Sequence, residues 1–360
     1  MFSRKSEDTE TNIPYWYRPH RSCTKLPILF IHGIGIGLLP YIPFLRALAA
    51  QDPDVGILAI EILPICMRIT APPLGRDAMC AAITCILNAH GLHRVVLAGH
   101  SYGTTVSAHL LRRQWGSVDP LLNPFTTAQQ PAHESTDRHH VINHNNSNAG
   151  SGGLIAATLL IDPIPFLLHH PAVAYNFVYR QPHHAPEWLL WYFSSREPDT
   201  ARALSRHLFW FECILFRDDI LDATCGGGRG STSAAGKKRP MPVTVSLAGR
   251  DQIVDARAVR AYLTGSKDPE EEEQVNTVGK GRAGLPPSRW EQDGLEVLYF
   301  PELDHATVVD TPSDRAPLLG TLHRFVRLDE EGDEDEGTRS VDVAGASAGA
   351  TLDGNLVDVE

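Results

Sequence analysis

Apolar residues occur along this chain in short, unbroken runs, and most runs are followed by a segment with the spacing of an amphipathic helix. The runs lack the alternation of a half-buried strand, so they predict strands covered on both faces, as in a mostly parallel sheet. Together they predict an α/β fold with a doubly wound sheet. The runs span residues 26–31, 55–63, 94–98, 154–161, 242–248 and 295–300. The helical spacing recurs over residues 41–50, 76–90, 104–115, 254–263 and 317–326.

The stretch between the fourth and fifth runs breaks this alternation. Residues 164–224 are rich in aromatic side chains at helix-like spacing and are too apolar for a loop. They predict a helical lid over residues 163–225. The lid divides the core into a first part, residues 26–162, and a second part, residues 226–327.

Other segments are too polar or too rich in glycine to belong to the core. We expect flexible insertions at residues 117–153, 226–240 and 265–293. Residues 1–25 form an N-terminal extension that we expect to be partly disordered, chiefly in its first twelve residues. Residues 328–360 form an acidic tail that we expect to be disordered.

The charge of the chain is concentrated at one end. Of the formal net charge of −11, a balance of −10 falls on residues 329–360, which leaves the rest of the chain close to neutral. No basic surface for nucleic acid is therefore predicted.

The cysteines and the apolar runs indicate the cellular compartment in which we expect the protein. None of the six cysteines forms a metal-type CxxC pair, and most lie in apolar runs, which favours free thiols in a reducing compartment. The polar N-terminus does not resemble a signal peptide, and no uncharged apolar run reaches the length of a membrane span. We expect an intracellular protein, cytoplasmic or peripherally associated with a membrane.

The third apolar run ends in a Gly-x-Ser-x-Gly sequence, residues 99–103, and a helical segment follows at once. A buried strand that turns this sharply into a helix pushes the central side chain out at the carboxyl edge of the sheet. The glycines are required because a Cβ at either position would collide with the neighbouring strand or helix. Ser101 is thus predicted to lie at the positive end of a helix as an activated nucleophile.

Two other strand ends carry the groups that would activate such a serine. His305 follows the last run and is the predicted base, and Asp251 follows the fifth run and is the predicted acid that orients it. Asp162, at the end of the fourth run, is the alternative acid, or else a residue that braces the site. The resulting order is Ser, Asp, His.

The same chemistry needs donors for an oxyanion. The backbone N–H of Tyr102 is one candidate, because it opens the helix after the serine. The second is expected from the glycine-rich loop after the first run, at Ile34, with Gly35 the next choice. Glycine in this loop lets the backbone approach a substrate closely.

These motifs together resemble the α/β-hydrolase superfamily. The sequences LPILFIHGIGIG, GHSYG, GRDQIVD and DHA carry the resemblance, which spans about residues 26–327. Within the lid, DPIPFLLHHPAVAYNFVYR and EWLLWYFSSREPDTARALSRH are similar to uncharacterised fungal hydrolases of the AB hydrolase-1 type. The resemblance implies an α/β-hydrolase fold with Ser101 as nucleophile, Asp251 as acid and His305 as base. Asp304 stands where many relatives have glycine, which makes the loop before the histidine stiffer.

The sequence thus predicts a serine hydrolase that cleaves a carboxylic ester, with a hydrophobic or lipid-like acyl group suggested by the apolar lid. A non-catalytic scaffold, or an acyltransferase or thioesterase with the same triad, is the alternative. We expect no cofactor and no metal, because the histidine pairs of the chain lie in adjacent positions that cannot converge on one ion. The expected partner is a small-molecule ester or lipid, with contact to a membrane surface. The residues predicted to line a substrate pocket are His32, Gly33, His100, Trp188 and Trp191.

Overall fold

The computed structural model describes residues 2–5, 13–116, 153–224, 241–266 and 287–329. Within these ranges nine strands form one sheet, in the order β1-β2-β4-β3-β5-β6-β7-β9-β8. The six strands from β4 to β9 in this order are parallel, and β1, β2 and β8 pair antiparallel at the two edges. The strands are β1 Ser3–Lys5, β2 Tyr15–Arg18, β3 Ile28–Ile31, β4 Ile57–Ile60, β5 Val95–His100, β6 Ile155–Ile161, β7 Val243–Ala248, β8 Ser288–Gln292 and β9 Leu295–Phe300.

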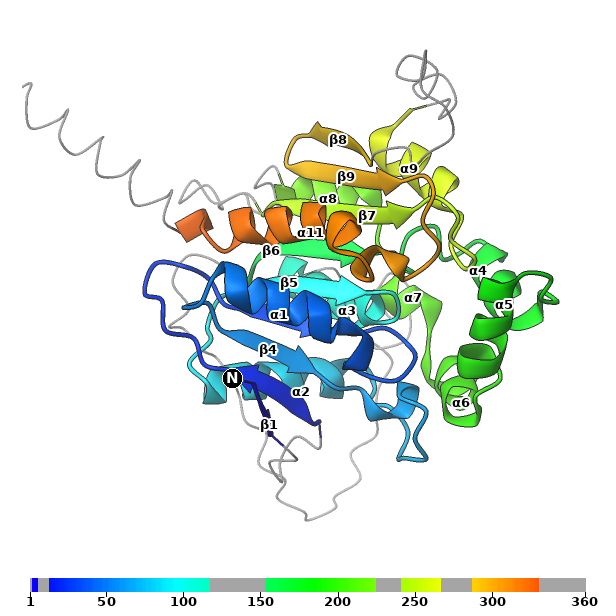
Figure 1. Cartoon of the computed structure of the whole chain (residues 1–360), viewed down its shortest axis with the longest axis horizontal. Helices are drawn as coiled ribbons and strands as arrows, with labels where there is room; N and C mark the ends of the chain where they lie inside the picture. Colours follow the sequence, from blue (N-terminus) through cyan, green and yellow to red (C-terminus); the bar gives the residue numbers. More distant parts are fainter. Residues whose placement is uncertain (1, 6–12, 117–152, 225–240, 267–286, 330–360) are drawn as a thin grey trace, which may run out of the picture.

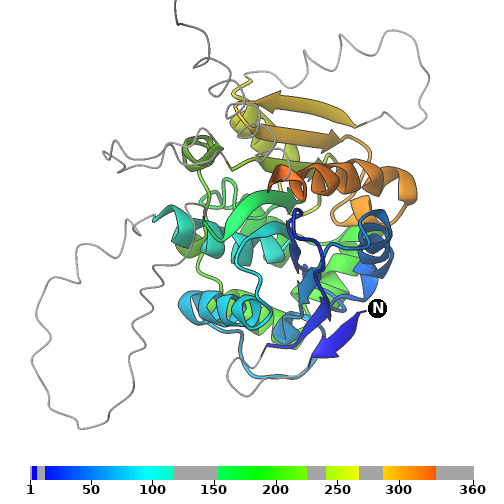
Figure 2. The same cartoon turned by 90° about the vertical axis from the view of Figure 1, so that its left-hand side faces the viewer.

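Helices cover both faces of the sheet (Figures 1 and 2). On one face, α1 (Ile42–Gln51) and α11 (Pro312–Phe325) pack on the side chains of β3, β5 and β6, with Phe30 and Leu159 at the centre of that core. The other face is covered by α2 (Arg76–Ala89), α3 (Gly103–Trp115), α8 (Arg217–Thr224) and α9 (Ala256–Thr264). The parallel strands are buried along their whole length. This arrangement confirms the predicted α/β-hydrolase fold.

Residues 163–216, hereafter the cap, consist mainly of short helices beyond the carboxyl ends of the parallel strands (Figure 1). Hydrogen bonds attach the cap to the core at several places, among them Arg112 of α3, which donates to the carbonyl oxygens of Phe211 and Ile214 at 3.2 and 3.0 Å. Arg180 and Asn176 donate to the carbonyl oxygens of Gln252 and Ile253 in the loop after β7, at 2.6 and 3.0 Å. Its helices are α4 Ala172–Ala174, α5 Ala185–Leu190, α6 Pro198–His207 and α7 Trp210–Cys213, with π-helical turns at Tyr175–Tyr179 and Trp191–Ser195. In α6, Asp199 accepts from the N–H of Thr70 at 2.8 Å, and Arg202 donates to the carbonyl oxygen of Thr70 at 2.7 Å.

Three short 3₁₀ turns complete the elements: Leu39–Tyr41, Leu63–Ile65 and Thr307–Val309. None of the described helices is both long enough and apolar enough to cross a bilayer. The cysteines among the described residues are free, with Cys66, Cys80 and Cys213 buried. Cys225 lies outside the described residues.

The structure differs from the sequence prediction at three element boundaries. Ser3–Lys5 pairs with β2, although this part of the chain was expected to be disordered. Ser288–Gln292 forms β8 inside the predicted insertion 265–293, because a tight turn at Asp293-Gly294 (φ 52° and 79°) folds it back on β9. Helix α11 starts at Pro312, five residues earlier than predicted, since Thr311 caps the N–H of Asp314. The predicted insertions at 117–153 and 226–240, and the tail after Asp329, lie almost entirely outside the described residues.

Candidate active site

The turn between β5 and α3 places Ser101 at the carboxyl edge of the sheet. Ser101 has a φ of 50°, a left-handed conformation that is strained for a residue with a Cβ. The two flanking glycines make the turn sterically feasible. A Cβ at Gly99 would collide with the Ser107 hydroxyl, and a Cβ at Gly103 would collide with the carbonyl oxygen of Ile31. Thr104 then fixes the turn from the helix side, since its hydroxyl donates to the carbonyl oxygen of Ser101 at 2.5 Å.

Three strand ends bring Ser101, His305 and Asp251 into one hydrogen-bonded series. The Oγ of Ser101 lies 2.8 Å from Nε2 of His305, and Nδ1 of His305 lies 2.6 Å from Oδ2 of Asp251. The other oxygen of Asp251 accepts the N–H groups of Ile253 and Val254 at 2.7 and 2.9 Å, which fixes the carboxylate. With the Nδ1 proton directed at Asp251, Nε2 is free to accept the hydroxyl proton of Ser101.

The charge of Asp251 sets the proton affinity of His305. Burial alone would lower the pKa of His305, but the adjacent carboxylate and its hydrogen bond outweigh that effect and raise the pKa above 6.5. An imidazole with a raised pKa is a stronger base for a hydroxyl proton.

Asp162, the alternative acid, lies in the same region but forms no hydrogen bond with either ring nitrogen of His305. It is 1% exposed, and its two oxygens accept the N–H groups of Ala248 (3.0 Å) and Ala306 (2.8 Å). Burial favours the neutral acid, but His100 and His305 nearby outweigh it and lower the pKa of Asp162. Asp162 is thus an ionised brace between the loop that carries Asp251 and the loop that carries His305.

The loop after β3 faces the serine turn. Gly33 is in contact with it, because an added Cβ would lie 2.8 Å from Nδ1 of His100 and 2.9 Å from Cβ of Ser101. The N–H of Gly35 donates to the carbonyl oxygen of Ile65 at 3.1 Å and is not available to a substrate. Within the described part of the chain, the N–H groups of Ile34 and Tyr102 have no acceptor. These two amides remain the candidate oxyanion donors.

Four other residues predicted to line a pocket have contacts of their own within the core or the cap. His32 is fully buried, with Nδ1 2.6 Å from the carbonyl oxygen of Gly33 and Nε2 accepting the N–H of Ile62 at 2.9 Å. Burial lowers the pKa of His32 to about 4, so the ring is a neutral link between two loops. His100 is 2% exposed, and its Nδ1 lies 2.5 Å from the hydroxyl oxygen of Tyr41. Trp188 stacks on Tyr192 at the surface of the cap, and Trp191 lies under the guanidinium of Arg196.

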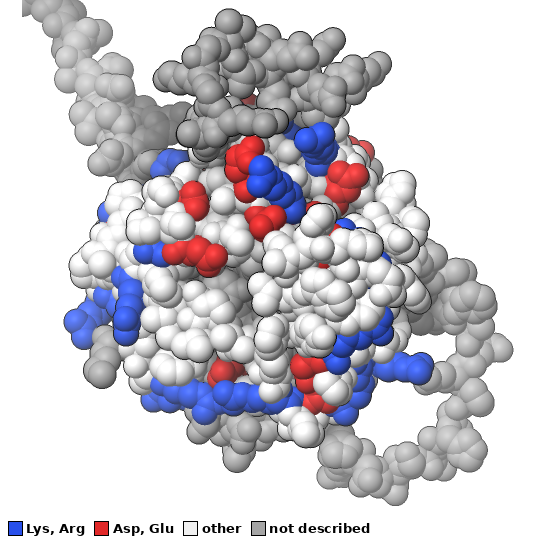
Figure 3. Space-filling view, turned by 45° about the vertical axis from the view of Figure 1, so that its right-hand side comes forward, with Lys and Arg blue, Asp and Glu red and all other residues white. Residues whose placement is uncertain are grey.

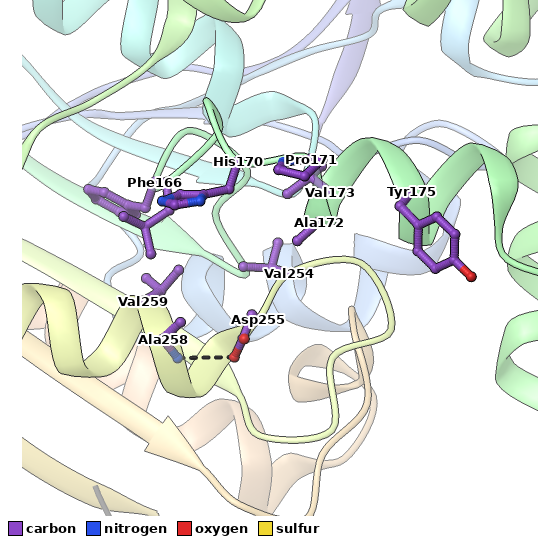
Figure 4. Close-up of a pocket in the computed structure, with 11 residues that line it drawn as sticks. Phe166, His170, Pro171, Ala172, Val173, Tyr175, Val254, Asp255, Ala258 and Val259 are labelled. Atoms are coloured by element: carbon purple, nitrogen blue, oxygen red, sulfur yellow. Dashed lines mark hydrogen bonds between the residues drawn. The ribbon is translucent and has the colours of Figure 1, made fainter. Parts of the chain in front are cut away.

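An apolar groove of about 470 Å³ lies between the start of the cap and α9 (Figure 4). Phe166, His170 and Ala172 form one side, and Val254 and Val259 form the other. Ser101, His305 and Asp251 do not line the groove, but both of its sides follow residues that are hydrogen-bonded close to them. One begins at Ile164, whose N–H donates to the Thr104 hydroxyl at 3.1 Å, and the other begins where Asp251 accepts the N–H of Val254. None of the residues predicted to line a pocket borders this groove.

Asp162, Asp251 and His305 each bring one potential metal-ligand atom within 4.8 Å of the others. The hydrogen bonds described above use Nδ1 of His305, both oxygens of Asp251 and both oxygens of Asp162. Hydrogen bonding therefore explains the cluster without an ion, and the prediction of no metal stands as a prediction.

Sequence analysis missed three residues that shape the site. Thr104 fixes the serine turn, and Gln252 accepts the N–H of His305 through Oε1 at 3.2 Å. Tyr41 accepts the N–H of Gly33 at 3.0 Å. Two of them could have been found from the sequence, because Thr104 directly follows the serine motif and Gln252 directly follows Asp251. Tyr41 could not, because its contact depends on how the loop after β3 folds.

No protein-family model matches the chain, and no curated protein does. Several solved structures are similar at low identity. A membrane phospholipase A, described as a bacterial virulence factor, is 14% identical over 91% of this chain and 87% of that chain, with a TM-score of 0.48. A putative aryl esterase from Burkholderia cenocepacia is 13% identical over 92% of this chain and 100% of that chain, with a TM-score of 0.45. The 2-hydroxy-6-oxo-6-phenylhexa-2,4-dienoate hydrolase of Rhodococcus sp. strain RHA1 is 11% identical over 90% and 98%, with a TM-score of 0.48.

At these identities and scores the similarities say nothing about reaction or substrate. The resemblance of the cap to fungal hydrolases stays a prediction. A functional assignment must therefore come from the geometry of the site.

Proposed function

We propose that this chain is a serine hydrolase that cleaves a carboxylic ester through an acyl-enzyme. The observation that carries the proposal is the hydrogen-bonded series from Ser101 through His305 to Asp251, with distances of 2.8 and 2.6 Å. Each member comes from a different strand end, and the hydrogen bonds run in the order, hydroxyl to imidazole to carboxylate, that acyl transfer needs.

In the proposed reaction, Oγ of Ser101 attacks the ester carbonyl while Nε2 of His305 takes the hydroxyl proton. Asp251 stabilises the imidazolium through the Nδ1 hydrogen bond. The amides of Ile34 and Tyr102 donate to the oxyanion, a contribution of about 3–4 kcal/mol per donor in other enzymes. The tetrahedral intermediate collapses, His305 protonates the leaving alcohol, and water then attacks the acyl-enzyme by the same route in reverse. No cofactor takes part.

Asp251 is assigned as the acid because its carboxylate reaches Nδ1 of His305 directly. Asp162 has both oxygens committed to backbone amides, which supports its role as a brace. A serine at this turn also argues against chemistry that uses a carboxylate nucleophile.

The proposed substrate has a hydrophobic or lipid-like acyl group. The groove between the cap and α9 is lined mainly by apolar side chains and has the volume of a ligand site. Among the described residues, large exposed apolar side chains lie on three segments, 36–42, 67–74 and 175–216. All three follow carboxyl ends of parallel strands, and the side of the molecule turned forward in Figure 3 has a broad uncharged area. This distribution favours contact with a lipid aggregate or membrane surface.

Labelling with a fluorescent fluorophosphonate tests the proposal. We expect wild-type protein to be labelled and Ser101→Ala and His305→Ala to lose labelling. Ser205→Ala is the matched control, since Ser205 is an exposed serine on α6, and it should be labelled like wild type. Folded wild-type protein without labelling would contradict the proposal and favour a non-catalytic scaffold. A panel of p-nitrophenyl esters from acetate to palmitate then measures acyl preference, and equal rates across the panel would contradict the lipid-like substrate.

A further inference from the structure

A second, buried line of polar side chains runs behind the Ser101–His305–Asp251 series. The hydroxyl of Tyr41 accepts the N–H of Gly33 at 3.0 Å and lies 2.5 Å from Nδ1 of His100. On the other side of the ring, Nε2 of His100 lies 3.7 Å from Oδ2 of Asp162. Tyr41, His100 and Asp162 are 4%, 2% and 1% exposed, so the line is shielded from water.

The three residues of this line adjoin four loops that carry the proposed chemistry. Tyr41 holds Gly33, which precedes the candidate oxyanion donor Ile34. His100 precedes Ser101. Asp162 holds the N–H of Ala248, before the loop of Asp251, and the N–H of Ala306, directly after His305.

The protonation states of these side chains define the direction of the hydrogen bonds along the line. Burial lowers the pKa of His100 despite the nearby carboxylate of Asp162, and burial raises the pKa of Tyr41. The ring is therefore neutral and the phenol is protonated. The negative charge of Asp162 favours the tautomer with its proton on Nε2, although 3.7 Å is longer than a hydrogen bond and the attraction is electrostatic. In that tautomer Nδ1 accepts the hydroxyl proton of Tyr41, and the Tyr41 oxygen accepts from Gly33.

We propose that Tyr41, His100 and Asp162 are positioning residues that keep the oxyanion loop in register with Ser101 and His305. The inference rests on the proposed hydrolase function. None of the three contacts the reacting atoms. They act by fixing where the amide of Ile34 points relative to the serine, which matters more for the transition state than for the bound ester.

The test is Tyr41→Phe, which removes only the hydroxyl. We expect kcat for p-nitrophenyl butyrate to fall about tenfold, equivalent to about 1.4 kcal/mol, with KM changed less than twofold. The Ki of a trifluoromethyl ketone, whose adduct places an oxyanion in the hole, should rise by the same factor. A merely structural role would not move kcat and this Ki together while leaving KM unchanged.

Tyr15→Phe is the matched control. Tyr15 is equally buried and its hydroxyl lies 3.0 Å from Nε2 of His90, but it belongs to β2, two strands beyond β3. We expect both variants to lose thermal stability and only Tyr41→Phe to lose kcat. Equal kcat values in an active wild type and in Tyr41→Phe would overturn the inference and leave the hydrolase proposal intact. A wild type without esterase activity would overturn both.

His100 provides a second test that does not depend on the folding of Tyr41→Phe. The side-chain oxygen of asparagine can occupy the position of Nδ1 and accept the Tyr41 proton, whereas leucine cannot. The Ki of the ketone should therefore stay within about threefold of the wild-type value in His100→Asn, and it should rise by more than that in His100→Leu. The same Ki in both variants would contradict the role assigned to the Tyr41–His100 contact.

Discussion

The hydroxyl of Thr104 joins the carbonyl oxygen of Ser101 to the backbone N–H of Ile164, at 2.5 and 3.1 Å. It donates to the first and accepts from the second. One fully buried side chain thus fixes the serine turn and the first residues of the cap relative to each other.

Replacing Thr104 with valine keeps the shape of the side chain and removes both hydrogen bonds. The N–H of Ile164 is left buried without an acceptor, so we expect the free energy of unfolding to fall by about 1–3 kcal/mol. Urea denaturation measures this change. Thr84→Val is the control, because Thr84 makes a similar bond to Cys80 within α2 but is only partly buried; an equal loss in the two variants would contradict the linking role.

Asp251→Asn should change both the rate and its pH dependence. The proposed base must be neutral, and Asp251 raises the pKa of His305 above 6.5, so wild-type kcat/KM should fall as the pH drops through that raised value. Without the carboxylate of Asp251, the pKa of His305 loses the largest influence that raises it and keeps only that of Asp162, so it falls and the acidic limb of the profile moves to lower pH. The plateau should fall on the order of 10⁴-fold, as in a serine protease with the same change.

A pH profile of ester hydrolysis from pH 4 to 9 measures both effects. Asp314→Asn, at the exposed start of α11, should leave the profile unchanged. A wild-type plateau in Asp251→Asn would transfer the role of the acid to Asp162.

Gly33→Ala tests how closely the oxyanion loop approaches the serine turn. The new Cβ would lie within 3 Å of both His100 and Ser101, so one of the two backbones must move. We expect the free energy of unfolding to fall by about 1–3 kcal/mol. The fraction of kcat that is lost should be larger than the fraction of the free energy of unfolding that is lost. In Gly320→Ala, nothing lies within 4 Å of the new Cβ in α11, so stability should rise by about 0.5–1 kcal/mol. Thermal unfolding and ester hydrolysis of both variants give the comparison, and a fully active Gly33→Ala would contradict the close approach.

Leu189→Ser with Tyr192→Ser removes two exposed apolar side chains of the cap, which are 60% and 65% exposed. If this surface contacts lipid, the double variant should bind phosphatidylcholine vesicles at least tenfold more weakly and hydrolyse dissolved p-nitrophenyl butyrate at the wild-type rate. Vesicle co-sedimentation measures the first and absorbance the second. Trp290→Ser, on edge strand β8, should bind vesicles like wild type. Equal binding by all three proteins would rule out this part of the cap as the contact.

The sequence predicted the parallel strands well because their burial on both faces leaves an unbroken apolar run, as in residues 295–300 of β9. Strand β8 was missed because an edge strand exposes charged side chains, so Arg289 and Glu291 resembled a loop. The Asp293-Gly294 turn was the signal that could have identified it. Residue spacing alone identifies strands with two buried faces far better than strands at an edge.

The part of the site that lies at the carboxyl ends of predicted strands could be predicted, and Ser101 and Asp251 do lie within hydrogen-bond distance of His305. The roles of His100 and Tyr41 were not predictable. Whether His100 faces a pocket or the interior depends on the register of β5 with β3 and β6, and Tyr41 reaches it only because the chain between β3 and α1 folds into a 3₁₀ turn. Tertiary contacts of this kind leave no periodic trace in the sequence.

The antiparallel strands at the two ends of the sheet also affect how the protein behaves at high concentration. β1 is three residues long, exposed and basic, and the edge strand β8 carries an Arg289–Glu291 ion pair. A second molecule that tried to extend the sheet would have to pair with a very short strand or displace these charges. Both ends of the sheet, as far as the structure describes them, therefore disfavour polymerisation by strand pairing.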